Sequence, residues 1–376
     1  MQTRPDFAAA KGFTGKVWRN GIFVSASFHI QNGKIKEGLK QPAVKADYVI
    51  PPFIDPHIHG GWGLDVHKGH FAPLEKKMLG QGIFCAVPTL DNNSFNSLSQ
   101  SGADFMDFLR SRPDSIFPFL RIEGPFISSY KKGFQNSRWI QKITTEAYER
   151  LFGVPGIGMF TFAPELEGSS ELVKHAFKKG IIPSVGHSRA GFEEFMRVYQ
   201  LGVKHFTHYP NAMSGMHHRD IGLTGAGLYL NDLQLEVIGD GVHNSREFLL
   251  LLKQIRGDSF ALTSDLIPPA FSKLDRFDGR RLAVHGATIT TANGTLAGGA
   301  VPVPQQVPLL FKWGWTPDSL VRMACENARK YLNLPVPSLE AGQTADFLIL
   351  DRSMELAAVY RRGRLVTKEE SEWKTA

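Results

Sequence analysis

Residues 48–59 read Tyr-Val-Ile-Pro-Pro-Phe-Ile-Asp-Pro-His-Ile-His, a largely apolar run that ends in two histidines. On an extended segment His57 and His59 lie two positions apart, so both side chains project to the same face and can share one divalent ion. A single pair of this kind is equally compatible with packed, structural histidines, because intermediate burial is common for this residue. The rest of the chain decides between the two interpretations.

The same pattern recurs four more times along the chain. Short apolar runs end in Glu, His or Asp at Arg121-Ile122-Glu123, Ser184-Val185-Gly186-His187, Phe206-Thr207-His208 and Leu262-Thr263-Ser264-Asp265. The carboxyl ends of parallel strands gather at one face of a barrel, so we expect these side chains to converge. The recurrence therefore predicts a metal centre assembled from several strand ends.

Candidate strands alternate with amphipathic segments from residue 48 onward, which is typical of βαβ units. Eight such units favour a TIM-type (β/α)8 barrel in the α/β class. A doubly wound sheet is the alternative, but no Gly-x-Gly-x-x-Gly follows the first strand. The expected strands lie near residues 49–59, 83–89, 116–123, 159–165, 182–187, 204–208, 233–240 and 260–265, and helical spacing occurs at 94–110, 170–179, 191–201 and 245–255.

The two ends of the chain differ from its middle. Residues 17–36 alternate polar and apolar side chains around the turn signal Asn32-Gly33, and residues 344–351 and 359–366 resemble the strands of a hairpin. We therefore expect a small β-sandwich domain built from residues 1–48 and 335–376. The remaining residues, 49–334, would form the catalytic barrel.

Composition narrows the classes of function. The net charge is +7, with 43 basic and 36 acidic residues scattered over 376 positions, which favours a solvated surface or an anionic small substrate over nucleic acid. Only Cys85 and Cys325 are present, which gives no thiolate metal site and fits a reducing compartment. The sequence shows neither a secretory leader nor a run of eighteen apolar residues. We expect a soluble, cytoplasmic protein without a membrane partner.

Several segments together resemble one known family. They are Asp55-Pro56-His57-Ile58-His59, Glu123-Gly124-Pro125, Val185-Gly186-His187-Ser188, Asn211-Ala212-Met213 and Leu296-Ala297-Gly298-Gly299. In this order, and over almost the whole chain, they are similar to the N-acetylglucosamine-6-phosphate deacetylases of the amidohydrolase superfamily. The Glu-Gly-Pro segment discriminates best, because many amidohydrolases place a carboxylated lysine where this family has a glutamate.

The resemblance implies a metal centre of defined composition. Glu123, His187 and His208 would hold the principal divalent ion, and His57 and His59 a second, so one or two ions per subunit are expected. One carboxylate with two imidazoles is the ligand type of open, catalytic sites. Zinc is the first candidate and iron, manganese and cobalt are alternatives, since all accept such ligands. An ion of this kind lowers the pKa of water to about 7.

Asp265, at the end of the last expected strand, is the natural general base. It would take a proton from the attacking water and return it to the leaving amine, because an unprotonated amide nitrogen leaves poorly. The alternative is that its carboxylate caps the following loop.

The resemblance also implies the substrate contacts. Arg219 matches an arginine that binds phosphate across a dimer interface, so a homodimer is expected; its guanidinium can donate two parallel hydrogen bonds to a phosphate. The alternative for Arg219 is a surface ion pair with Asp220. The other implied contacts to the sugar, the phosphate or the acyl group are Phe134, Gln135, Asn211, Ala212, Asp240, His243, Leu296, Ala297 and Gly298.

One departure bears on specificity. After Lys131-Lys132-Gly133 the family usually carries a histidine two residues on, whereas this chain has Phe134-Gln135. Glutamine can hydrogen-bond a hydroxyl but does not titrate. The leading hypothesis is deacetylation of N-acetylglucosamine 6-phosphate; the alternatives are its galactosamine epimer or another N-acyl or amide substrate. A non-catalytic binding protein conflicts with the retention of every ligand and of Asp265.

Overall fold

The computed structural model describes residues 7–366, which form two compact units. The first unit takes in the described residues up to Ile54, Lys76–Cys85, and those from Val303 onward. The second unit comprises Asp55–Glu75 and Ala86–Pro302. The expected domain boundaries at residues 48 and 335 stay a prediction.

Eight strands form one sheet in the order β14-β13-β12-β11-β10-β9-β8-β5. Ile58, the last residue of the first strand, bridges Leu266, which lies beyond the last strand, in parallel. Beside this bridge, the backbone N–H of Asp265 donates to the carbonyl of His57 at 3.0 Å. The sheet therefore nearly closes into a barrel. The TIM-type fold is thus confirmed. The strands are β5 (Phe53–Ile58), β8 (Ile83–Asp91), β9 (Leu120–Glu123), β10 (Ile157–Phe162), β11 (Ile182–Val185), β12 (His205–Phe206), β13 (Gln234–Val237) and β14 (Ala261–Leu262).

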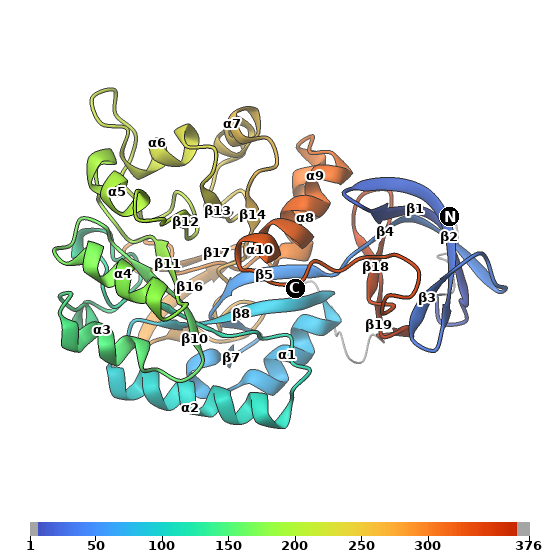
Figure 1. Cartoon of the computed structure of the whole chain (residues 1–376), viewed down its shortest axis with the longest axis horizontal. Coiled ribbons are helices and arrows are strands. Elements are labelled where there is room, and N and C mark those ends of the chain that lie inside the picture. Colours follow the sequence, from blue (N-terminus) through green and yellow to red (C-terminus); the bar gives the residue numbers. More distant parts are fainter. Residues whose placement is uncertain (1–6, 367–376) are drawn as a thin grey trace. The chain divides into compact units, whose positions relative to one another are not determined.

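Helices follow the strands and lie on the outside of the barrel (Figure 1). Some begin where the sequence supplies a side-chain cap: Ser94 accepts from the backbone N–H of Ser97, and Ser245 from that of Phe248. The four segments expected from helical spacing are all helical. The helices of this region are α1 (Phe71–Gly80), α2 (Phe95–Ser111), α3 (Thr145–Phe152), α4 (Ser169–Lys178), α5 (Phe192–Tyr199), α6 (Gly222–Tyr229) and α7 (Arg246–Arg256).

The first unit contains a sheet to which both ends of the chain contribute. Asn32 and Gly33, at φ 52° and 71°, make the tight turn that their sequence predicts. Aromatic rings fill the core of this sheet, with Phe347 stacked on Tyr360 at 4.6 Å between centroids. The order is β20-β19-β18-β4-β1-β2-β3, with β1 (Gly12–Arg19), β2 (Ile22–Gln31), β3 (Lys34–Glu37), β4 (Ala43–Ile50), β18 (Phe347–Leu350), β19 (Leu356–Arg361) and β20 (Arg364–Leu365).

Helices also belong to the first unit. They are α8 (Val303–Lys312), α9 (Pro317–Val321), a π-helical turn at Arg322–Glu326 and α10 (Asn327–Tyr331). The sheet built by both termini agrees with the expected small β domain.

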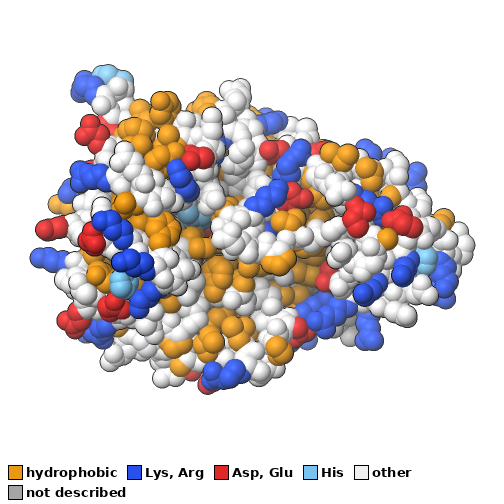
Figure 2. Space-filling model, viewed as in Figure 1, with side chains coloured by type: hydrophobic (Ala, Val, Ile, Leu, Met, Phe, Trp, Pro, Cys, Tyr) orange, Lys and Arg blue, Asp and Glu red, His pale blue; other side chains and the backbone are white. Residues whose placement is uncertain are grey.

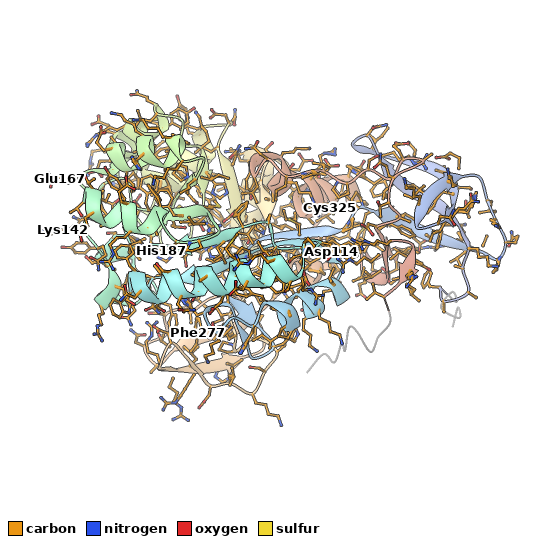
Figure 3. All side chains as sticks on the ribbon, turned by 60° about the horizontal axis from the view of Figure 1, so that its bottom comes forward. Asp114, Lys142, Glu167, His187, Phe277 and Cys325 are labelled. Carbon is orange, nitrogen blue, oxygen red and sulfur yellow. The ribbon has the colours of Figure 1, made fainter. Side chains whose placement is uncertain are left out.

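A small antiparallel sheet follows β14 and was not expected from the sequence. It comprises β15 (Arg276–Phe277), β16 (Arg280–His285) and β17 (Thr288–Thr291). Phe277 (Figure 3) stacks on Phe134 with ring centroids 5.6 Å apart, which fixes this sheet to the loop after β9. A two-stranded ribbon, β6 (Gly60–Gly61) with β7 (Leu64–Asp65), follows the first barrel strand.

Figure 2 shows one face of the molecule, on which hydrophobic, basic and acidic side chains are all exposed. Basic and acidic side chains are interspersed there. Within residues 7–366, no helix has both the length and the apolar character needed to span a bilayer.

Candidate metal centre and active site

The five predicted metal ligands meet at the carboxyl ends of the barrel strands. Their ligand atoms form two overlapping groups, and within each group these atoms lie within 4.8 Å of one another. One group is His57, His59 and Glu123, and the other is Glu123, His187 and His208. All five side chains are buried (His187 is labelled in Figure 3).

Glu123, the last residue of β9, belongs to both groups. Its Oε1 lies 2.8 Å from Nε2 of His208 and 3.1 Å from Nε2 of His187. Its Oε2 lies 3.4 Å from Nε2 of His59. Oε1 also lies 3.7 Å from Nε2 of His57, so this one carboxylate faces all four imidazoles.

The outer nitrogens of three histidines face defined partners. Nδ1 of His57 lies 3.1 Å from Oγ1 of Thr207, and Nδ1 of His187 lies 2.9 Å from the carbonyl of Lys131. Nδ1 of His59 lies 3.4 Å from Oδ1 of Asp91, an ion-pair contact without hydrogen-bond geometry. Partners of this kind orient an imidazole and fix its tautomer. Here they leave the Nε2 atoms directed at the shared centre.

The electrostatics of the cluster fit a bound cation. Burial and the charge of Arg121 lower the pKa of His57 to about 4, so this ring is neutral, as a ligand must be. Burial also disfavours protonation of His59 and His187, yet the neighbouring carboxylates raise the pKa of both rings, Asp91 acting most strongly on His59 and Glu123 on His187. The cluster thus favours added positive charge. A divalent ion supplies it, and nitrogen and oxygen donors without thiolate suit zinc, iron or manganese.

Asp265 lies just beyond β14 and faces the same centre. Its Oδ1 is 3.3 Å from Nε2 of His59 and 3.5 Å from Nε2 of His57. The backbone of Asp265 is left-handed, at φ 51°, as are those of His187 (47°) and His208 (29°). Strained conformations of non-glycine residues cluster at functional sites, where the surrounding structure holds them.

A cavity of about 1090 Å³ opens over this centre. His59, Glu123, His187, His208 and Asp265 line it. The predicted substrate residues that also line it are Phe134, Gln135, Asn211, Ala212, His243, Leu296, Ala297 and Gly298.

Two predicted substrate residues lie elsewhere. Asp240 stands behind His243, with Oδ2 2.7 Å from Nδ1 of that ring. Arg219 is exposed, and its guanidinium lies 3.1 Å from the ring of His218.

Comparison with known proteins identifies the family of this chain. The amidohydrolase family matches residues 48–366, most of the chain. The chain belongs to the amidohydrolase family. The crystal structure of N-acetylglucosamine-6-phosphate deacetylase from Thermotoga maritima is 31% identical, with a TM-score of 0.85 over 94% of this chain and 98% of that one. The amidohydrolase described here is therefore a member of the deacetylase branch that its sequence resembles.

Two further relatives differ in the sugar that they are named for. The N-acetylglucosamine-6-phosphate deacetylase of Bacillus subtilis (strain 168) is 28% identical, over 94% of this chain and 96% of the relative. The N-acetylgalactosamine-6-phosphate deacetylase of Escherichia coli O157:H7 is 25% identical, over 86% and 88%.

Sequence reasoning missed several residues in the cavity of this amidohydrolase. Asp91 ends β8, so the rule that found the other ligands also applies to it. Four cations line the walls: Lys131 and Lys132 precede the Phe134-Gln135 departure noted in the sequence, and Arg280 and Arg281 come from β16, which no pattern had placed near the site.

Proposed function

We propose that this amidohydrolase removes the N-acetyl group from an amino-sugar 6-phosphate, with N-acetylglucosamine 6-phosphate as the first candidate, to release acetate and the free amine. One observation carries the proposal: the carboxylate of Asp265 lies 3.3 Å from His59 Nε2, beside the convergent ligand groups and at the wall of a large cavity. This is where a base must stand to act on a water molecule at the metal centre.

The proposal includes one or two divalent ions per subunit. Glu123, His187 and His208 would hold the principal ion, and His57 and His59, with the shared carboxylate of Glu123, the other. Zinc is the first candidate, with iron, manganese and cobalt as alternatives. Such an ion polarises a carbonyl and makes hydroxide accessible near neutral pH.

Asp265 would move the proton. Burial alone would raise its pKa, but the neighbouring imidazoles of His57 and His59 lower it, so the carboxylate is ionised at neutral pH. It can therefore accept a proton from the attacking water. Once protonated, it can donate to the amide nitrogen, which must be protonated to leave as an amine.

The charge distribution of the cavity supports an anionic substrate. Its carboxylates, Asp91, Glu123 and Asp265, lie at the metal centre, whereas the side chains of Lys131, Lys132, Arg280 and Arg281 supply positive charge on the walls. A ligand with an amide at one end and a phosphate at the other matches this polarity.

His243 adds a further donor. Burial lowers its tendency to ionise, but Asp240 raises the pKa of His243, which favours a cationic ring that can donate to a phosphate or hydroxyl oxygen. In the proposal, Asn211 and Ala212 contact the sugar or the phosphate, the backbone of Leu296, Ala297 and Gly298 borders the acyl end, and Phe134 lines the same cavity.

Arg219 would contact only the substrate bound to a second subunit. It is exposed and outside the cavity lining of its own chain, so a phosphate clamp at this position would serve the neighbouring site. A cytoplasmic homodimer is therefore part of the proposal. The second candidate substrate is N-acetylgalactosamine 6-phosphate, favoured by the similarity to the Escherichia coli O157:H7 relative.

The test is release of free amine by metal-loaded protein from four compounds: both 6-phosphates and both sugars without phosphate. We expect turnover of a 6-phosphate and at most weak turnover of the neutral sugars. The Asp265→Asn variant is the control for contaminating activity. Absence of turnover on all four by protein that retains its metal would refute the proposal.

A further inference from the structure

Two residues beside the metal centre, Asp91 and Gln135, have contacts that the proposed reaction does not use. We propose that they are positioning residues: Asp91 orients His59, and Gln135 holds Glu123, so that the group His57, His59 and Glu123 is preset for its ion. The inference rests on the metal centre of the proposed function, but not on the identity of the substrate.

The amide of Gln135 is fully occupied by the protein. Its Nε2 lies 2.7 Å from Oε2 of Glu123 and 3.1 Å from Oδ1 of Asp91, and its Oε1 accepts the backbone N–H of Asn92 at 2.9 Å. A glutamine amide has two N–H donors and one carbonyl, so these contacts use each of them. The side chain is 5% exposed. The two N–H donors of Gln135 therefore face the two carboxylates, and its expected contact with the sugar stays a prediction.

Asp91 is one of four side chains that contact one another in a ring, together with His59, Glu123 and Gln135. Its Oδ1 lies 3.4 Å from the outer nitrogen of His59, whose inner nitrogen faces Oε2 of Glu123 at 3.4 Å. Gln135 joins Asp91 to Glu123, so the four side chains constrain one another. A carboxylate at the outer nitrogen of a ligating histidine fixes its ring and raises its basicity.

A neutral amide is suited to the position of Gln135, between the carboxylates of Asp91 and Glu123. It donates a hydrogen bond to each of two carboxylates and adds no positive charge that would repel a metal ion. Each carboxylate oxygen has a second lone pair, so Oε2 of Glu123 can accept from Gln135 and still face an ion. The loop is held in turn, because the backbone N–H of Gln135 donates to the carbonyl of Lys132 at 2.9 Å.

Asp91 and Gln135 contact different metal ligands, so their substitutions should affect metal binding differently. Asp91 faces His59, a member of only one ligand group, whereas Gln135 contacts Glu123, which belongs to both. Loss of the Asp91 carboxylate should therefore weaken one ion. Loss of the Gln135 amide should weaken both.

The experiment is titration of metal-free protein with Co²⁺, followed by calorimetry and by visible absorption. We expect Asp91→Asn to weaken one Co²⁺ by about 10–100-fold and to leave the other within twofold of wild type, and Gln135→Ala to weaken both. The matched control is the exposed pair on α2, where Nε2 of Gln100 donates to Asp104 at 2.9 Å. Gln100→Ala and Asp104→Asn should change neither affinity.

The inference is overturned if Asp91→Asn binds every Co²⁺ as wild type does, or if the control pair causes an equal loss. Circular dichroism of the metal-free variants checks that they fold. Should Asp91→Asn fail to fold, Gln135→Ala decides, since unchanged affinity for both ions in that variant also overturns the inference. Because Co²⁺ binding needs no substrate, inactivity on every amino sugar would refute the proposed reaction and leave this result standing.

Discussion

Arg121 and Glu236 form an ion pair inside the barrel: Nη1 of the arginine lies 2.8 Å from each oxygen of the carboxylate. Both side chains are 0% exposed. Oε2 of Glu236 lies 3.8 Å from Nδ1 of His57, so the pair stands directly behind a predicted metal ligand. Burial opposes ionisation of Glu236, but Arg121 holds the pKa of Glu236 well below its ordinary value.

We expect Glu236→Gln to lower the free energy of unfolding by about 3–5 kcal/mol at neutral pH, because it leaves the Arg121 charge buried without its partner. Since the folded-state pKa of Glu236 is depressed, its stabilisation is present above the unfolded-state value of 4.5 and is lost as the pH falls through the folded-state value. Urea unfolding at pH 7.5 and at a pH below 4.5 should show a smaller difference between wild type and variant at the lower pH. A difference that grows in acid would contradict the assignment.

Asp265→Asn should lower kcat by about 10²–10⁴-fold, because the amide cannot accept a proton. The variant should keep its metal content and its melting temperature, since the backbone bond from Asp265 to His57 does not involve the side chain. Steady-state kinetics with metal analysis separate the two effects. If asparagine supports wild-type kcat, another group is the base.

Arg219 can be tested by subunit complementation. If it serves the neighbouring site, Arg219→Ala and Asp265→Asn each give inactive homodimers, but a mixed dimer contains one site with both groups intact. In a symmetric dimer with random pairing, co-expression should restore about a quarter of wild-type activity. Equal inactivity of the mixture would show that Arg219 does not act across an interface.

Gly186→Ala should disturb the site through packing. A Cβ at this position would lie 2.0 Å from Cγ2 of Thr207, whose hydroxyl faces Nδ1 of His57. Overpacking of this kind costs about 1–3 kcal/mol. We expect a lower melting temperature and weaker Co²⁺ binding. Gly215→Ala is the matched control, because a Cβ there meets nothing within 4 Å and should change neither property.

The sequence was most informative where one rule covered both fold and site. Apolar runs that end in Glu, His or Asp predicted five of the eight barrel strands and the convergence of His57, Glu123 and His187. Asp91 follows the same rule and was missed because the expected strand stopped at residue 89, whereas β8 runs to Asp91. The side chain therefore seemed to lie in a loop.

Other features depend on contacts that no local pattern contains. The pairing of Arg121 with Glu236 joins residues 115 positions apart and requires that both face the barrel interior. The placement of Arg280 at the cavity depends on its position over the ring of Phe134, 3.5 Å from the centroid. Alternation along one strand cannot select such partners, because it specifies a face and not what lies opposite.

The closure of the barrel runs through the site itself. The backbone N–H of Asp265 donates to the carbonyl of His57, and that of His59 to the carbonyl of Leu266 at 2.8 Å, so the seam between first and last strands is formed by the base and the ligands. An ion held by His57 and His59 would thus stabilise the backbone hydrogen bonds between the first and last strands. Amide hydrogen exchange at Asp265 and His59 should slow when metal is added, as local opening would have to release the ion first.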